Sequence, residues 1–113
     1  MNPAGARAED LCERLLVRAG LKVLARNWRC RFGEIDLIAE ERGTLVFVEV
    51  RYRSGAAFGG AGESITAAKR ARVAAAARAW LADRPEAPCR FDVLLVESPS
   101  GDRVRWIRDA FEG

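Results

Sequence analysis

The chain contains no histidine among its 113 residues. This absence excludes Ser-His-Asp and Cys-His catalysis, nucleases with histidine metal ligands, and every mechanism in which histidine is the general base. Any chemistry that this chain performs must therefore use carboxylates, lysine or arginine, and a metal ion.

Lysine and cysteine are also scarce. Lys22 and Lys69 are the two lysines among 19 basic residues, and the arginine excess is better explained by nucleotide composition than by phosphate recognition. The cysteines Cys12, Cys30 and Cys89 are odd in number and widely spaced, so they form neither a zinc-ligand pattern nor a disulfide framework. We expect burial of Cys12, on a predicted helix, and of Cys89, beside a predicted strand.

Long hydrophobic runs are absent. No apolar segment approaches the roughly 18 residues needed to span a bilayer, and residues 1–7 lack a hydrophobic signal segment. We therefore expect a cytoplasmic protein with no membrane partner. Half of the residues are apolar, so residues 1–113 can form a single domain with a modest core. The net charge of +3 and the pI near 9.1 mildly favour a polyanionic partner.

The apolar pattern predicts an α/β protein with the element order α-β-β-β-α-β-β. Residues Ala6–Ala19 form an amphipathic helix that ends at Gly20. An alanine-rich helix starts near Ser64 or Thr66 and runs to about Asp83. The strands are expected at Leu21–Arg26, Gly33–Glu40, Thr44–Tyr52, Arg90–Glu97 and Val104–Arg108.

The connections also follow from composition. The second helix should face solvent through its basic residues, of which we expect Lys69 and Arg70 to reach a phosphate. Its core-facing residues are expected to be Ile65, Val73, Ala76, Ala77, Trp80 and Leu81. The other expected segments are a polar connection at 27–32, a hairpin turn at 41–43, a flexible glycine-rich loop at 54–62 and a turn at 98–102.

Acidic residues inside two apolar strands carry most of the functional information. These strands are Gly33–Ala39 and Phe47–Arg51. Side chains alternate along a strand, and buried unpaired charge is unfavourable, so a hard divalent cation with oxygen ligands is a natural partner. The residues sharing a face are Glu34 with Asp36 and Glu49 with Arg51, whereas Ile35, Leu37, Val48 and Val50 face the other way.

The spacing of these acidic residues matches a known signature. An acidic residue followed about a dozen positions later by Glu-X-Lys in a strand is typical of the PD-(D/E)XK nuclease superfamily, and here Asp36 is followed thirteen residues later by Glu49, Val50 and Arg51. The chain more closely resembles the YraN-type uncharacterised family of endonuclease-like proteins, from about residue 5 to residue 96. The matching stretches are A-E-D-L, G-L-K-V-L-A-R-N-W-R, G-E-I-D-L-I-A, L-V-F-V-E-V-R-Y-R, F-G-G-A-G-E-S-I, K-R-A-R-V and R-F-D-V-L-L-V.

The resemblance implies a restriction-endonuclease-like fold, with an αβββαβ core and a mixed central sheet flanked by helices. It also implies a DNA endonuclease that depends on Mg²⁺ or Mn²⁺. Asp36 and Glu49 match the catalytic metal-binding carboxylates. By analogy with archaeal Holliday-junction resolvases, Glu9 joins the metal site, and the backbone carbonyl of Val50 is a further ligand.

Arg51 occupies the position of the usual lysine and leaves three interpretations open. Arginine stays protonated and cannot be a general base, although it can hold a phosphate bidentately. In the first interpretation, Arg51 stabilises the transition state while a metal hydroxide attacks unaided. In the second, Lys69 or Arg53 substitutes for the lysine. In the third, the site binds DNA without cutting it. Arg70, beside Lys69, is another candidate phosphate contact.

Each candidate residue also has a purely structural interpretation. Trp80 is expected in the core, Trp28 and Phe58 are undecided between core packing and base stacking, and Asp92 is expected to be structural beside Arg90. For the acidic residues, the structural interpretations are an ion pair of Glu34 with Arg31 or Arg53, an exposed first-turn Glu9, and salt bridges of Asp36 or Glu49 with Arg51 or Arg90.

Three classes of function therefore remain. The first is a metal-dependent endonuclease acting on branched or otherwise structured DNA, and the second is a non-catalytic nucleic-acid-binding protein that keeps the nuclease fold. The third is an interaction protein in which the carboxylates are structural. Many nucleases of this fold act as dimers, so the resemblance also allows a homodimer with two sites on one duplex.

Overall fold

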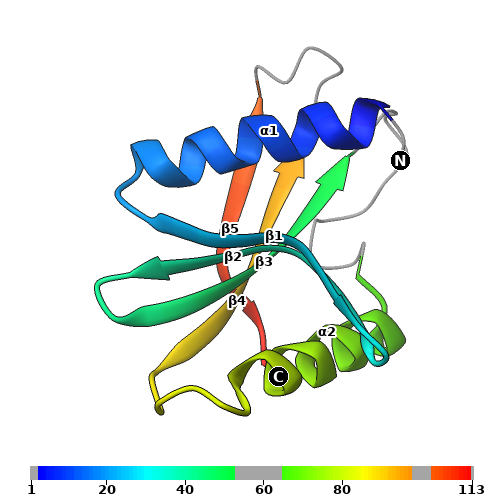
Figure 1. Ribbon diagram of the computed structural model, residues 1–113. Helices are drawn as coiled ribbons and strands as arrows, with labels where there is room; N and C mark the ends of the chain where they lie inside the picture. Colours follow the sequence, from blue (N-terminus) through cyan, green and yellow to red (C-terminus); the bar gives the residue numbers. More distant parts are fainter. Residues whose placement is uncertain (1–2, 53–64, 98–102, 113) are drawn as a thin grey trace.

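The computed structural model describes residues 3–52, 65–97 and 103–112. Within these residues, two helices and five strands follow one another along the chain (Figure 1). Their bounds are α1 Pro3–Arg18, β1 Lys22–Cys30, β2 Gly33–Glu41, β3 Thr44–Tyr52, α2 Ala67–Leu81, β4 Cys89–Val96 and β5 Val104–Phe111.

The strands form one mixed sheet in the order β1-β2-β3-β4-β5. Neighbouring strands are antiparallel except for β3 and β4, which are parallel. A parallel pair needs a crossover connection, and α2 lies in the connection between β3 and β4. Helix α1 covers one face of the sheet and α2 covers the other (Figure 1). This arrangement confirms the predicted α/β class and matches the predicted restriction-endonuclease-like αβββαβ core.

Each helix packs an apolar face onto the sheet. On the α1 side, Cys12 and Leu16 pack with Val48 and other strand residues. On the α2 side, the rings of Phe47 and Trp80 meet edge to face with centroids 5.9 Å apart. Trp80 and Cys12 are therefore core residues, as the sequence predicted, and burial raises the pKa of the Cys12 thiol to about 12.

Strand β1 continues through the segment that we expected to be a connection. Residues up to Cys30 pair with β2, and Trp28 lies opposite Ile35. Trp28 packs against the core on the α2 side. The prediction of a polar connection at 27–32 was wrong because Asn27 has a positive φ of 52°, which breaks the regular alternation by which a strand is recognised.

Strand β2 changes phase at Asp36. The predicted alternation placed Ile35 and Leu37 on one face, but Ile35 packs on the α2 side and Leu37 on the α1 side. The flanking pairs place Asp36 opposite Asn27 of β1. The irregular backbone at Asn27 thus lies beside Asp36, the residue of β2 at which the alternation of side chains between the two faces of the sheet is interrupted.

The beginning of β4 and the end of β5 also differ from expectation. Cys89 is exposed rather than buried because it is the first residue of β4, at the margin of the sheet. Strand β5 continues three residues past its expected end to Phe111, whose ring stacks on that of Phe91 at 4.9 Å. The loop expected at 54–62 and the turn at 98–102 lie outside the described residues.

The predicted start and stop signals are confirmed. Gly20 follows α1 with a φ of 96°, and the β2–β3 turn has positive φ at Arg42 and Gly43, as a tight hairpin turn requires. Thr66 caps α2 by accepting a hydrogen bond from the backbone N of Lys69 at 3.1 Å. Neither of the helices described is long and apolar enough to cross a membrane.

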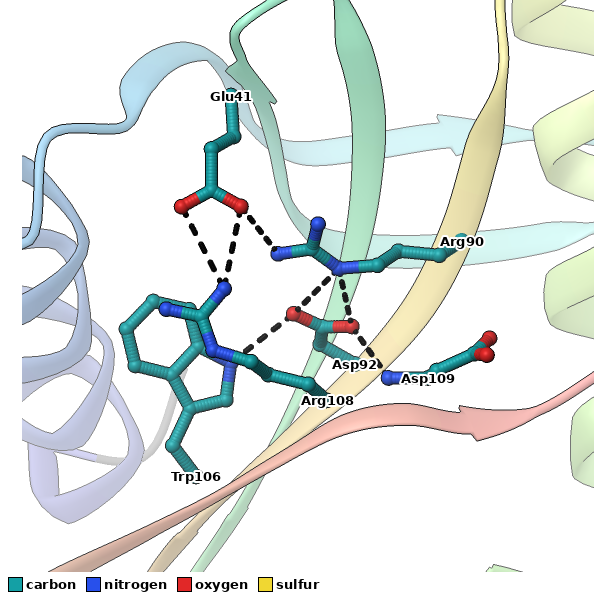
Figure 2. Close-up of polar contacts among 6 residues, drawn as sticks. All are labelled: Glu41, Arg90, Asp92, Trp106, Arg108 and Asp109. Carbon is teal, nitrogen blue, oxygen red and sulfur yellow. Dashed lines mark hydrogen bonds and ion pairs between the residues drawn. The ribbon is translucent and has the colours of Figure 1, made fainter.

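A charged network fixes β5 to β4 (Figure 2). The fully buried Asp92 carboxylate accepts hydrogen bonds from Arg90 Nε at 3.0 Å, Trp106 Nε1 at 2.9 Å and the backbone N of Asp109 at 2.9 Å. Glu41 adds ion pairs to Arg90 at 2.9 Å and to Arg108 at 3.1 Å. The structural role predicted for Asp92 beside Arg90 is therefore confirmed.

Candidate functional site

The site forms where β2 and β3 stop pairing. Among the described residues, their ladder runs from the Glu41–Thr44 pair to the Leu37–Val48 pair. The next residue of β2 is Asp36, and its Oδ2 accepts a hydrogen bond from the backbone N of Val50 at 2.8 Å. The Asp36 carboxylate therefore takes the place of a ladder hydrogen bond. It is held at the gap between β2 and β3, that is, where the pairing of the two strands ends.

Glu49 brings a second carboxylate to the same gap from β3. Glu49 is only 1% exposed, and its Oε1 lies 3.4 Å from Nζ of Lys69 on α2. The other oxygen, Oε2, makes no hydrogen bond within the described part of the chain. A buried carboxylate oxygen without a donor is unusual, because no hydrogen bond compensates for the free energy of removing it from water.

The two carboxylates are electrostatically coupled. Burial, assisted by the charge of Asp36, raises the pKa of Glu49 to about 7, although Lys69 acts in the opposite direction. Burial also raises the pKa of Asp36 to about 6, opposed mainly by the Val50 N–H and reinforced by Glu9. Without further positive charge, this pair is poorly stabilised as two anions.

Glu9 approaches from α1, on the opposite side of the sheet from Lys69. Its Oε1 accepts a hydrogen bond from Asn27 Nδ2 at 3.1 Å and lies 3.7 Å from Arg26 Nη2. Glu9 is near enough to Asp36 to raise its pKa. The interpretation of Glu9 as an ordinary exposed glutamate is thus wrong, because the side chain is 13% exposed and bound to β1.

Lys69 does not belong to the outward face of α2 as we expected. Its side chain is 30% exposed and is directed to Glu49, while Val73, Ala76 and Trp80 of the same helix are buried. Positions 69, 73, 76 and 80 follow three- and four-residue steps and so lie on one stripe of a helix. The apolar pattern did not assign Lys69 to the inward stripe of α2, because Lys69, the first residue of this stripe, is charged.

Arg51 and Glu34 are the other predicted site residues on the two strands that carry Asp36 and Glu49. Arg51 is half-buried on β3 opposite Leu95 of β4. Glu34 pairs with Arg29 at 3.1 Å, and among the described residues this is its ion pair in place of the one expected with Arg31. The position of Arg53 lies outside the described residues, as does that of Phe58.

Two more arginines that the sequence linked to the site can be placed. Arg70 is half-buried in the first turn of α2, next to Lys69. Arg90, one of the expected salt-bridge partners of the site carboxylates, is instead bound to Asp92 and Glu41. The contact of Glu49 with Lys69 was not predicted. The helical spacing of Lys69 from Val73, Ala76 and Trp80 could have predicted that Lys69 faces the sheet.

The donor set of the site is small. In the part of the chain that the structure describes, no group of three or more Asp, Glu, Cys or His side chains is placed to hold a metal ion. Mg²⁺ is nevertheless commonly bound through one or two carboxylates, with waters and substrate phosphates completing its shell. Asp36 and Glu49, with their raised pKa values and one unpartnered oxygen, are a donor set that fits such an ion.

Comparison with known proteins gives relatives that match nearly the whole chain. The model of the uncharacterised protein family UPF0102 matches residues 8–96. A UPF0102 protein of Methylobacillus flagellatus is 52% identical over 111 residues, which cover 98% of each chain. Similar proteins occur in Dechloromonas aromatica, 51% identical over 95% of this chain and 87% of the relative, and in Nitrosomonas europaea, 49% identical over 96% and 92%.

Proposed function

The chain belongs to the uncharacterised protein family UPF0102, and on that premise we propose that it is a metal-dependent endonuclease for structured DNA. The observation that carries the proposal is the meeting of two coupled carboxylates, Asp36 and Glu49, with the ammonium group of Lys69 at one gap in the sheet. DNA as the substrate, and its branched form, rest on the resemblance to nucleases of this fold.

Asp36 and Glu49 would hold Mg²⁺ or Mn²⁺ between β2 and β3. When bound, such an ion acidifies a water molecule and stabilises negative charge on a phosphate. The backbone N–H of Val50 orients Asp36 for this role, because it occupies Oδ2. Glu9, bound to Asn27, supplies further negative charge from the α1 side.

Lys69 takes the role that the motif normally gives to the residue at position 51. Its Nζ lies 3.4 Å from Glu49 Oε1, so it can donate a hydrogen bond to an attacking water or to a phosphate oxygen beside the ion. Arg51 lies on the face of β3 that alternation assigns to Glu49. We assign to it a contact with a phosphate oxygen, a role that suits a guanidinium.

The decisive experiment is cleavage of labelled junction, flap and plasmid DNA in Mg²⁺ or Mn²⁺. We expect Glu49→Gln to abolish cleavage and Lys69→Met to lower its rate by about 100-fold or more. Lys22→Met is the matched control, because Lys22 is the other lysine and is exposed at the start of β1. Cleavage that survives Glu49→Gln would contradict the proposal and indicate a contaminating nuclease.

Two further results distinguish the catalytic roles and the classes of function. Arg51→Lys should leave the cleavage rate within a few-fold of wild type if Lys69 has the catalytic role, whereas a large gain would assign that role to position 51. Binding of DNA and Mn²⁺ without cleavage of any of these substrates would identify the non-catalytic binding protein instead. A homodimer stays a prediction of the resemblance and is tested by light scattering with and without a duplex.

A further inference from the structure

The β1–β2 hairpin ends in an exposed aromatic residue that directly follows two arginine positions, 29 and 31. Phe32 is 45% exposed at the turn, and the guanidinium carbon of Arg31 lies 4.8 Å from the centre of its ring. Arg29, two residues earlier, has a side chain that is 71% exposed. A single exposed apolar residue is ordinary, but an aromatic ring with adjoining arginines combines the two groups that bind unpaired nucleotides.

The backbone of this hairpin tip is held in place. Trp28 and Cys30 of β1 and Ile35 of β2 pack into the core on the α2 side. Gly33 approaches α2 so closely that an added Cβ would lie 3.1 Å from the carbonyl oxygen of Arg72. The tip therefore rests on α2 (Figure 1), and its aromatic ring is presented from a fixed support, which lowers the entropy cost of binding.

The hairpin tip also lies on the strand that carries the site. Asp36 is three residues from Gly33 along β2, a distance of about 10 Å at roughly 3.3 Å per residue. A nucleic-acid strand with one base stacked on Phe32 would thus have a nearby phosphate within reach of the Asp36 and Glu49 carboxylates.

We infer that the hairpin tip, formed by Arg29, Arg31 and Phe32, is a binding platform for an unpaired nucleotide of the substrate strand. The Phe32 ring stacks on the base, and the arginines contact the adjacent phosphates. Exposed Arg72 of α2 adds positive charge where Gly33 meets the helix. This inference rests on the proposed function and identifies its substrate as DNA or RNA with single-stranded character beside the cut.

The test compares dissociation constants for labelled single-stranded DNA, single-stranded RNA and duplex DNA of equal length, measured by fluorescence anisotropy in EDTA. We expect Phe32→Ala to weaken single-strand binding by about 5- to 100-fold and duplex binding by less than about 2-fold. Phe32→Trp should retain the affinity. Leu24→Ala is the matched control, because Leu24 is also exposed on β1 but lies away from the tip.

The outcomes separate this inference from the proposed function. Equal binding by wild type and Phe32→Ala, or an equal loss on duplex and single strand, would overturn the platform, while Glu49-dependent cleavage by the same preparation would leave the nuclease proposal intact. If the wild-type protein binds none of the three probes, the platform is wrong, and the cleavage assay with junction and flap DNA decides the nuclease proposal separately. The two single-stranded probes show whether the platform takes DNA, RNA or both, and a preference for the duplex would contradict it.

Discussion

At the scale of single residues, the burial of Glu49 has consequences for stability. A carboxylate in the interior needs a cation or several hydrogen-bond donors, and the described donors leave Oε2 unpartnered. The neighbouring Asp36 carboxylate makes ionisation of Glu49 still less favourable. The metal-free protein therefore gives up stability in order to keep two acidic groups together, as functional sites often do.

The first prediction concerns the pH dependence of unfolding in EDTA. The pKa values of Asp36 and Glu49 are raised to about 6 and about 7, so between pH 4.5 and 7 the folded state keeps protons that the unfolded state has lost. The free energy of unfolding should consequently fall as pH rises through this interval, by up to about 5 kcal/mol in all, and stay low above pH 7. Urea unfolding from pH 4.5 to pH 8 measures this slope.

Glu49→Gln should flatten that slope, because the substituted side chain does not titrate. At pH 8 this variant should be at least as stable as wild type, although it loses a charge of the site. Glu86→Gln, which changes an exposed carboxylate outside the sheet, is the control and should leave the slope unchanged. A slope that is the same in wild type and Glu49→Gln would show that Glu49 does not titrate in this range.

Part of this centre could be predicted from residue types. Acidic residues inside two apolar strands indicated Glu34, Asp36 and Glu49 as candidates, because carboxylates seldom lie inside apolar strands unless they are paired or bind a metal, and the resemblance to the nuclease superfamily then selected Asp36 and Glu49. The contact of Lys69 with Glu49 could not be predicted in the same way. It depends on how far α2 stands above β3 and on the rotation of the helix, which are tertiary quantities.

At the scale of elements, the attachment of β5 depends on one buried carboxylate. Strand register shifts between Phe91 and Val93, and Asp92 at this irregularity accepts hydrogen bonds from three groups. We predict that Asp92→Asn lowers the free energy of unfolding by about 3 kcal/mol, because a buried ion pair loses one partner. Chemical denaturation measures the loss, and Asp83→Asn, at an exposed carboxylate after α2, should change stability by less than about 0.5 kcal/mol.

The contact between the hairpin tip and α2 gives a second prediction at this scale. In Gly33→Ala the new Cβ would lie 3.1 Å from Arg72 O and 3.3 Å from Arg72 Cβ, so the tip must shift away from the helix. We expect a stability loss of about 1 kcal/mol and weaker single-strand binding although Phe32 is still present. Thermal unfolding and anisotropy check the two effects, and unchanged binding would show that the position of the tip does not matter.

The elements that sequence reasoning missed share a physical cause. The sequence predicts a connection at the end of β1 because the polar segment that begins at Asn27 interrupts the alternation of the strand, and in the structure Asn27 has a positive φ at this point. Long-range pairing with β2 overrides this local irregularity. By contrast, the hairpin turn at Arg42 and Gly43 and the cap at Thr66 depend on local chemistry, so they were predictable.

At the scale of the whole molecule, the site is where four elements meet. Glu9 comes from α1, Asp36 from β2, Glu49 from β3 and Lys69 from α2, and these elements include the helices on both faces of the sheet (Figure 1). The order of these elements was predictable because each has its own periodicity. Their convergence depends on the register of β2 and β3, whose pairing ends at Leu37 and Val48.

The last prediction follows from this convergence. A divalent cation that binds the folded site, and not the unfolded chain, stabilises the whole domain in proportion to the logarithm of its concentration. Mn²⁺ at about 100 times its dissociation constant should add about 2.7 kcal/mol, and the gain should be smaller at pH 5.5, where protons compete for Asp36 and Glu49. Thermal unfolding across a Mn²⁺ titration at pH 5.5 and pH 8 measures both effects. Asp36→Asn should remove the stabilisation and Asp10→Asn, on the exposed side of α1, should keep it, whereas an equal gain in both variants would place the ion elsewhere.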